Sequence, residues 1–236
     1  MKEVIHVFNQ LAEIYEHSID SASLFNSEYE RPAMLECLPE DLSGLNIFDA
    51  GCAAGWYTVK LAQRGAKVTA ADISPEMVQA AKRRTGHLAE VHCLNLAGAL
   101  PFEDQSFDQI VSSLTLHYLE DWSATFKEFN RVLKPGGKLL FSFHHPFTDV
   151  QLLQEPLYFQ TDRIVDQWKK EGRTFAVPFY RRPLEKILNE TLSCFSIKEV
   201  VEPKPTERFK EQNPERYEEL LRAPVFLIIN AEKHRD

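Results

Sequence analysis

The chain has 236 residues, of which 44% are hydrophobic and 26% charged, a composition that suits one globular domain with a sizeable buried core. Its formal net charge of -8 disfavours a protein that grips nucleic acid by its phosphates, because such binding needs clustered basic side chains. We expect no membrane partner, because no apolar run is long enough to span a bilayer and the mixed charge of residues 1–17 is unlike a secretory signal.

The cysteines are scattered and show no paired spacing, so we expect them to be reduced in a cytoplasmic protein. They are Cys37, Cys52, Cys93 and Cys194. The histidines near Cys93 and near position 145 also lack the spacing of metal ligands, and the sequence predicts no metal site.

The N-terminal segment, residues 1–44, is predicted to be helical over 4–16 and 32–38, with a polar, irregular stretch at 19–25. Strands and helices then alternate, which predicts a doubly wound, mostly parallel α/β sheet with helices on both faces. The predicted strands are 46–50, 67–72, 90–94, 107–113 and 138–143, and the predicted helices between them are 56–64, 74–84 and 122–133.

Residues 145–180 interrupt this alternation, because they are rich in aromatic side chains and have no clear period. A long insertion of this kind is usually functional. We therefore expect a single domain spanning 1–236 in which 145–180 form an inserted substrate cap and 1–44 a helical segment over a ligand. A helix at 183–191 and strands at 196–201 and 225–231 resume the order and complete seven strands.

Residues 47–74 are the most informative segment of the sequence. A strand with Asp49 near its end leads into a turn that contains Gly51 and Gly55, then a helix and a second strand that ends in Asp72. Ligands of open parallel sheets bind beyond the carboxyl ends of the strands, so this turn should lie under a ligand. A helix N-terminus favours a carboxylate, Asp49 an ammonium group and Asp72 a ribose diol. S-adenosylmethionine carries these three groups.

A nicotinamide or flavin dinucleotide is the main rival ligand. Its fingerprint is GxGxxG, whereas this turn has Gly51 and Gly55 with alanines between them. Asp49 would also repel a pyrophosphate, so the segment disfavours a dinucleotide.

Five motifs resemble those of the class I S-adenosylmethionine-dependent methyltransferases, in the family's order and at its spacing. They are DAGCAAG (49–55), ADIS (71–74), NLAGALPFEDQSFD (95–108), SSLTLHYLEDW (112–122) and EFNRVLKPGGKLLFS (128–142). The resemblance covers residues 45–143 well and is greatest to the small-molecule group of ubiquinone- and glycine-methylating type. It implies a Rossmann-like methyltransferase fold with S-adenosylmethionine as the donor and S-adenosylhomocysteine as the product.

The resemblance also implies that the turn holds the methionine part of the cofactor and that Asp72 holds the ribose. The implied cofactor-binding residues are Asp49, Gly51, Cys52, Ala53, Gly55, Asp72, Ile73, Met77, Asn95, Leu96 and Ser113. Tyr15 and Tyr29 are expected to close over the cofactor, although core packing explains them equally well. Two positions depart from the family, which usually has glycine at Ala53 and often aspartate at Asn95. Alanine permits the turn if its φ is negative, and asparagine can both donate to and accept from adenine.

Several residues are candidates for the acceptor side. His117 follows the fourth strand, where it is a candidate substrate contact or catalytic base, because this position often faces the substrate in the family. A packing role is equally open. His144 and His145 end the fifth strand and point to opposite faces, so at most one reaches a given pocket, and either is a candidate base. We interpret Arg181 and Arg182 as a solvated surface pair, with a clamp for an acidic substrate as the alternative. The candidate substrate-binding residues are His117, His145, Tyr180 and Arg181.

We therefore expect a methyltransferase that acts on an O, N or C atom of a small molecule, as a monomer or homodimer without nucleic-acid partners. Such an enzyme must hold a nucleophile in line with the departing sulfur, and a general base adds less. The sequence Ser113-Leu114-Thr115-Leu116 lacks the prolines of base-amino methyltransferases and the Pro-Cys of cytosine C5 enzymes. Methylation of a tRNA base or a protein side chain, and cofactor binding without catalysis, remain alternatives.

Overall fold

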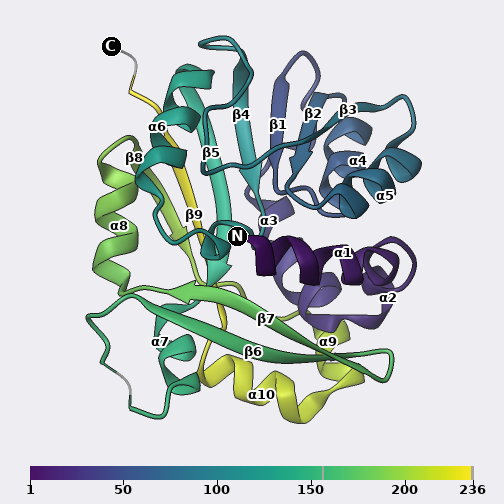
Figure 1. Cartoon of the computed structure of the whole chain (residues 1–236), viewed down its shortest axis with the longest axis vertical. Helices are drawn as coiled ribbons and strands as arrows, with labels where there is room; N and C mark the ends of the chain where they lie inside the picture. Colours follow the sequence, from purple (N-terminus) through teal and green to yellow (C-terminus); the bar gives the residue numbers. More distant parts are fainter. Residues whose placement is uncertain (156, 235–236) are drawn as a thin grey trace.

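A computed structural model describes residues 1–155 and 157–234 and confirms the predicted doubly wound sheet of seven strands (Figure 1). The strands are β1 (Asn46–Ala50), β2 (Lys67–Asp72), β3 (Ala89–Cys93), β4 (Phe107–Ser112), β5 (Leu133–His144), β8 (Ser196–Val201) and β9 (Phe226–Glu232). Their order is β3-β2-β1-β4-β5-β9-β8, with β1 to β5 parallel and β9 antiparallel to both of its neighbours. The order reverses between β1 and β4, which is where open α/β sheets bind ligands.

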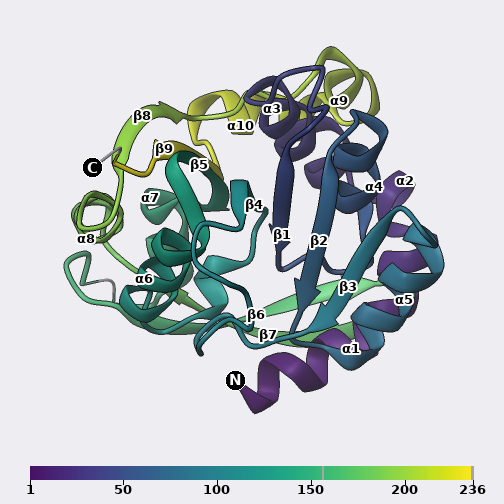
Figure 2. The same ribbon diagram turned by 90° about the horizontal axis from the view of Figure 1, so that it is seen from above.

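Helices cover both faces of the sheet (Figure 2). One face carries α3 (Arg31–Glu36), α4 (Trp56–Gln63) and α5 (Pro75–Thr85), and the other carries α6 (Ser123–Val132) and α8 (Leu184–Leu192). Successive side chains of β1 serve the two layers, because Ile47 packs on the α3–α4 side and Phe48 on the α6 side. Both side chains are fully buried, so β1 is fixed at the centre of the core.

The first helix of the N-terminal segment packs beside α5 rather than on the sheet. Its helices are α1 (Lys2–His17) and α2 (Ile19–Ala22), followed by a π-helical turn (Asn26–Glu30) that runs into α3. The prediction that 19–25 is irregular is wrong for α2. Ile19 is buried with Leu11 of α1, and this tertiary contact fixes a helical turn that the local sequence does not signal.

The insertion after β5 is more regular than the sequence indicates. It contains α7 (Pro146–Asp149), a 3-10 turn (Val150–Leu152) and an antiparallel hairpin of β6 (Asp162–Lys170) and β7 (Arg173–Arg181). Two of the side chains of β6 that face inward, Asp166 and Lys170, are charged. The sequence of β6 therefore lacks the apolar–polar alternation by which a strand is recognised. The hairpin crosses the carboxyl ends of the parallel strands, next to α1 (Figure 1).

Two short helices near the C-terminus, α9 (Glu207–Gln212) and α10 (Pro214–Arg222), were not predicted. They place Phe209 and Leu220 against Tyr29 and Phe226, and so close the end of the core below β9. Within 1–155 and 157–234, no helix has both the length and the apolar character that crossing a membrane requires.

Candidate functional site

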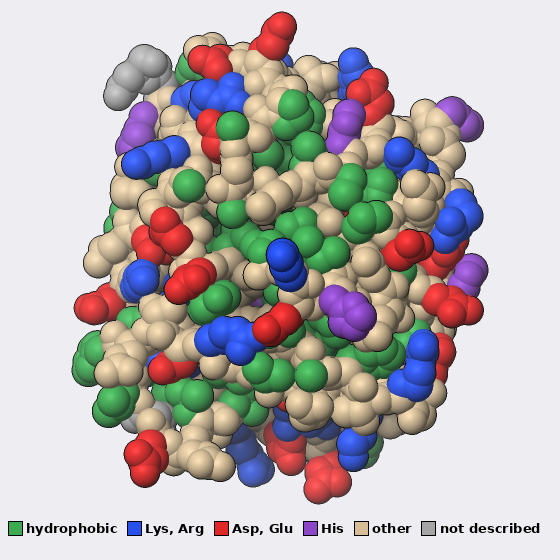
Figure 3. All heavy atoms as spheres, in the orientation of Figure 1, with side chains coloured by type: hydrophobic (Ala, Val, Ile, Leu, Met, Phe, Trp, Pro, Cys, Tyr) green, Lys and Arg blue, Asp and Glu red, His purple; other side chains and the backbone are tan. Residues whose placement is uncertain are grey.

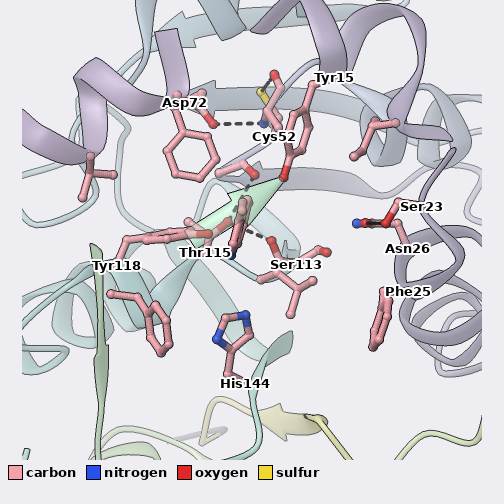
Figure 4. Close-up of a pocket in the computed structure, with 18 of the residues that line it drawn as sticks. Tyr15, Ser23, Phe25, Asn26, Cys52, Asp72, Ser113, Thr115, Tyr118 and His144 are labelled. Carbon is pink, nitrogen blue, oxygen red and sulfur yellow. Dashed lines mark hydrogen bonds between the residues drawn. The ribbon is translucent and has the colours of Figure 1, made fainter. Parts of the chain in front are cut away.

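A cavity of about 500 Å³ lies where the strand order reverses, between the sheet and the β6–β7 hairpin. This volume is within the usual range for small-molecule sites. Figure 4 shows Cys52 and Asp72 at one end, His144 at the opposite end, and Tyr15 and Tyr118 between them. The cavity therefore has a half that follows β1 and β2 and a half that the insertion covers.

The turn after β1 is built around Gly51. Its φ is 88°, and a Cβ placed on it would lie 2.2 Å from both Cγ2 and Oγ1 of Thr115. Thr115 in turn donates a hydrogen bond from Oγ1 to the Gly51 carbonyl (3.2 Å). The loop after β4 thus rests directly on this turn, and only glycine fits between them.

Ala53 adopts a φ of 45°, so alanine occupies the turn without meeting the condition of a negative φ. Its N–H donates to Asp72 Oδ2 (2.9 Å), and this bond holds the alanine in a left-handed conformation that favours glycine. The departure from the family's glycine therefore keeps the turn's shape and adds local strain.

Asp72 lines the cavity, as expected for a ribose contact. Besides Ala53, the N–H of Ser74 donates to its Oδ1 (2.9 Å). Burial raises the pKa of Asp72 to about 6, against the effect of these backbone hydrogen bonds. Each carboxylate oxygen has a second lone pair that can face a diol. Ile73, Asn95 and Leu96 line the same half of the cavity.

The other end of this half has a cation that the sequence analysis missed. Arg31 of α3 lines the cavity, pairs with Asp20 (2.8 Å) and lies over the ring of Trp56, 4.2 Å from its centroid. Cys52, Ala53, Ser113 and Tyr15 also line this region, and burial raises the pKa of Tyr15 to about 12, so its hydroxyl keeps its proton. A guanidinium and the N-terminus of α4 suit a carboxylate, and Asp72 suits a ribose, so the residues present fit S-adenosylmethionine.

Among the described residues, four predicted cofactor contacts lie outside the cavity lining. Asp49 is buried below the turn with its carboxylate toward α4, where Thr58 Oγ1 donates to it (2.6 Å). Burial raises the pKa of Asp49 to about 7. The alternation of side chains along β1 turns this residue away from the ligand space, so it supports the turn from behind.

The other three are packing residues in this structure. Gly55 caps α4, and a Cβ there would lie 3.3 Å from Cα of Ala81. Met77 is fully buried between α5 and α1. Tyr29 is fully buried too, and its hydroxyl accepts a hydrogen bond from the N–H of Val225 (3.2 Å), so core packing explains it.

A buried carboxylate beneath the cavity also escaped the sequence analysis. Glu30 is fully buried, and its Oε1 accepts from Oγ of Ser113 (2.8 Å) and of Ser142 (2.5 Å). The hydroxyl of Tyr57 donates to Oε2 (2.8 Å). Desolvation raises the pKa of Glu30, and the three hydroxyl groups oppose that rise. Because Ser113 and Tyr57 line the cavity, Glu30 fixes the position of two of its walls.

Of the three candidate histidines, His144 lines the cavity. Its Nδ1 is buried and without a hydrogen-bond partner among the described residues, 3.6 Å from Asp149 Oδ2. Burial lowers the pKa of His144 to about 4, so its imidazole is neutral near pH 7. His117 stacks on His144 with a centroid distance of 4.1 Å and lies behind it, outside the lining. His145 faces away and pairs with Glu202 (3.0 Å).

The basic pair at the end of β7 is not on the surface, so that interpretation is wrong. Arg181 and Arg182 are 1% and 2% exposed. Arg181 pairs with Asp162 and binds backbone carbonyls of the insertion, while Arg182 donates to the Leu119 carbonyl (2.6 Å). Both tie the hairpin to the domain. Neither they nor Tyr180 lines the large cavity in the described part of the chain.

The insertion-side walls of the cavity are residues that the sequence analysis did not assign to the site. They are Phe25, Thr115, Tyr118, Asp149, Asp166, Trp168, Phe179 and Phe226. Only the aromatic richness of residues 145–180 hinted at Trp168 and Phe179. Thr115 and Tyr118 lie in the 112–122 motif, and the others come from separate segments without a motif.

The turn gives a paired prediction. Gly51→Ala is expected to lower the free energy of unfolding by about 1–3 kcal/mol, because the left-handed φ and the contact with Thr115 both oppose a Cβ. Ala53→Gly in the same turn is expected to be neutral or stabilising, since it relieves the strain at φ 45°. Urea unfolding of both variants measures this, and equal destabilisation by the two would contradict the described turn.

Comparisons with known proteins agree with this geometry. Residues 48–141 match the Methyltransferase domain family. A demethylmenaquinone methyltransferase of Tropheryma whipplei is 30% identical over 187 residues, which are 79% of this chain and 67% of that protein. A malonyl-[acyl-carrier protein] O-methyltransferase of Erwinia pyrifoliae is 38% identical over 100 residues, 42% of this chain and 37% of that protein.

The fold also matches solved structures. An S-adenosylmethionine dependent methyltransferase from Mesorhizobium loti superposes with a TM-score of 0.69 at 29% identity, over 86% of this chain and 97% of that one. The sheet order, the cavity at its switch point and these relatives agree. The chain belongs to the class I S-adenosylmethionine-dependent methyltransferase family.

Proposed function

We propose that this methyltransferase acts on a small molecule that occupies the half of the cavity beneath the hairpin, beside His144. The single observation behind the proposal is that one cavity of about 500 Å³ joins the Asp72 half to a second half with different walls. The second half is enclosed by the insertion, and such an enclosure suits a small acceptor better than a polymer. The demethylmenaquinone methyltransferase relative supports a small acceptor as well.

We assign the cofactor to the half that contains Asp72. Asp72 would accept hydrogen bonds from the ribose, and Ile73, Asn95 and Leu96 would contact the adenine. Arg31 and the N-terminus of α4 would face the carboxylate. When bound, S-adenosylmethionine supplies a methyl group that is already electrophilic. The task of the chain is therefore to orient the acceptor and exclude water.

The N-terminal segment (1–44) and the insertion (145–180) would together cover this single domain's site. Val4, Phe8 and Tyr15 of α1 and Trp168 of β6 line the cavity, and α1 contacts β7. The insertion would act as the substrate cap, since it provides the walls that no methyltransferase motif contains.

A nucleic-acid substrate is not favoured. On the face drawn in Figure 3, acidic and basic side chains are interspersed rather than gathered in a basic patch. The net charge of -8 points the same way. We propose a cytoplasmic monomer or homodimer, which is consistent with four unpaired cysteines in the described structure.

Asp72→Ala tests the cofactor assignment. We expect it to weaken binding of S-adenosylhomocysteine by about 1.5–3 kcal/mol, as for lost hydrogen bonds to a charged group. Asp72→Asn keeps the acceptor for one backbone N–H and should weaken binding less. Isothermal titration measures both. Unchanged affinity in a folded Asp72→Ala variant would contradict the ribose assignment.

A further inference from the structure

We propose that the acceptor is a small organic amine, bound as its ammonium ion between Asp149 and Asp166 against aromatic walls. This inference rests on the proposed function, because it names the chemical class of the molecule that occupies the half of the cavity beside His144. Four features of that half support it: two carboxylates, a set of rings, the placement of the cations, and an imidazole without a partner.

Asp149 is a buried carboxylate without a donor. It is the last residue of α7, is 8% exposed and lines the cavity. None of the residues that the structure describes donates a hydrogen bond to its carboxylate, and its ion-pair contact is His144 Nδ1 at 3.6 Å. Arg181 attracts it electrostatically but is bonded to Asp162. A buried carboxylate is costly unless hydrogen-bonded, so this group points to a donor supplied by a ligand.

Asp166 brings a second carboxylate to the same wall. It projects inward from β6 and lines the cavity. The indole N–H of Trp168 donates to its Oδ2 (2.9 Å), and the N–H of Gln167 donates to its Oδ1 (2.7 Å), so its orientation is fixed. Its charge acts on Asp149, His144 and Tyr118, which places it near all three. Two neighbouring carboxylates with a shared opening favour a cation between them.

Aromatic side chains provide the remaining walls of this half. Phe25 and Tyr118 flank the space above His144 in Figure 4. Phe179 meets the His144 ring edge-on with a centroid distance of 4.7 Å, and Trp168 and Phe226 also line the cavity. The faces of such rings attract an organic ammonium ion once water is excluded.

The cations that line the cavity are placed elsewhere or already engaged. Arg31 and Arg84 both pair with Asp20 of α2. Lys169 and Lys170 lie at the turn end of β6, and Arg216 lies over the Phe25 ring and pairs with Glu219. A carboxylate acceptor would therefore meet two acids, while the arginines nearest to Asp149, Arg181 and Arg182, lie outside the lining of this cavity in the described structure. This arrangement disfavours a carboxylate.

His144 gives the amine a route to its reactive form. An ammonium ion has no lone pair, so it must first give one proton to a base. Nε2 of His144 can accept that proton, because it is the ring nitrogen that is not buried against the protein. Nδ1 faces Asp149 at 3.6 Å, so Asp149 can stabilise the imidazolium. The amine nitrogen then forms a bond to the methyl carbon as the carbon–sulfur bond breaks and its electron pair goes to sulfur. The products are a methylated ammonium ion and S-adenosylhomocysteine, and the proton on His144 leaves to solvent.

Binding of benzyltrimethylammonium, which cannot be methylated, tests the site without turnover. With S-adenosylhomocysteine present, we expect it to bind at least about tenfold tighter than phenethyl alcohol or phenylacetate, as measured by isothermal titration. Asp149→Asn and Asp166→Asn should each weaken it about tenfold while leaving the affinity for S-adenosylhomocysteine unchanged. Asp41→Asn is the matched control, because it makes the same charge change in an exposed loop.

The pH dependence gives an independent readout. Burial and Asp166 raise the pKa of Asp149 to about 8, so affinity for the fixed cation should rise with pH up to about 8 and then level off. Among the described residues, the other titratable or charged groups around Asp149 are His117, Tyr118, His144, Tyr180, Arg181 and Arg182. Both histidines have lowered pKa values and stay neutral here. The rise should therefore disappear in Asp149→Asn.

The outcomes separate this proposal from the proposed function. Failure to bind S-adenosylhomocysteine would overturn both. If S-adenosylhomocysteine binds but the ammonium ion does not, or phenylacetate binds as tightly, the amine site alone is overturned. An ammonium affinity that neither Asn variant changes would overturn it as well.

Discussion

Glu30→Ala is expected to lower the free energy of unfolding by about 3–5 kcal/mol, because it leaves a cavity and three buried hydroxyl groups without an acceptor. The hydroxyls belong to Tyr57, Ser113 and Ser142. Ser142 Oγ also accepts from the N–H of Leu114 (3.0 Å), a cavity residue whose φ is 46°. Loss of Glu30 should therefore loosen the β4 loop as well as the fold.

Glu30→Gln is the matched control. Its amide oxygen can accept from both serines and its NH₂ can donate to the Tyr57 oxygen, so we expect a loss of about 1 kcal/mol or less. Urea unfolding of both variants, at a pH near 7, measures the difference. Equal losses would contradict this account, because glutamine keeps both the size and the hydrogen-bonding capacity of the Glu30 side chain.

The fold could be predicted from local signals. Ser74 caps α5 with Pro75 at its first position, and its Oγ accepts from the N–H of Met77 (3.1 Å). Such start signals and the apolar runs of β1, β2 and β4 depend on near neighbours in the chain. By contrast, α2 and the β6–β7 hairpin depend on contacts with distant elements, which a single sequence does not reveal.

The cofactor half of the site was predictable for the same reason. Cys52, Asp72 and Asn95 belong to motifs at the ends of consecutive strands, and the structure brings them to one cavity. The side-chain direction was harder to predict. Asp49 lies one strand position before Ala50, and the two-residue period turns its carboxylate to the α4 side.

The half of the cavity beside His144 could not be predicted from motifs, because its walls come from six or more separate segments. Asp149 ends a four-residue helix, Asp166 projects from a strand with a hidden period, and Phe25 precedes a π-helical turn. Each has an ordinary local sequence. Their grouping depends on where the insertion folds back, and Arg181 and Arg182 fix that position from inside the protein.

Three cavity-region acids make the ligand-free protein sensitive to pH. Burial raises the pKa of Asp49 to about 7, that of Asp72 to about 6 and that of Asp149 to about 8, all from an ordinary value of 3.8. An acid with a raised pKa stabilises the fold while it is protonated, and this contribution is lost as the pH rises through the folded-state value. A cationic ligand that binds next to these carboxylates would offset the free-energy cost of their ionisation.

The free energy of unfolding without ligand is therefore expected to fall by about 2–3 kcal/mol between pH 6.5 and 8.5. Asp149 and Asp49 lose most of their protons in this window, whereas His117 and His144 have lowered pKa values and are uncharged throughout it. Urea unfolding at the two pH values measures the change. Asp149→Asn should remove more than half of it, because an amide cannot ionise. If the free energy of unfolding instead stays level or increases over this range, other groups of the protein already compensate the charges of these carboxylates. The cavity would then not need a cationic ligand.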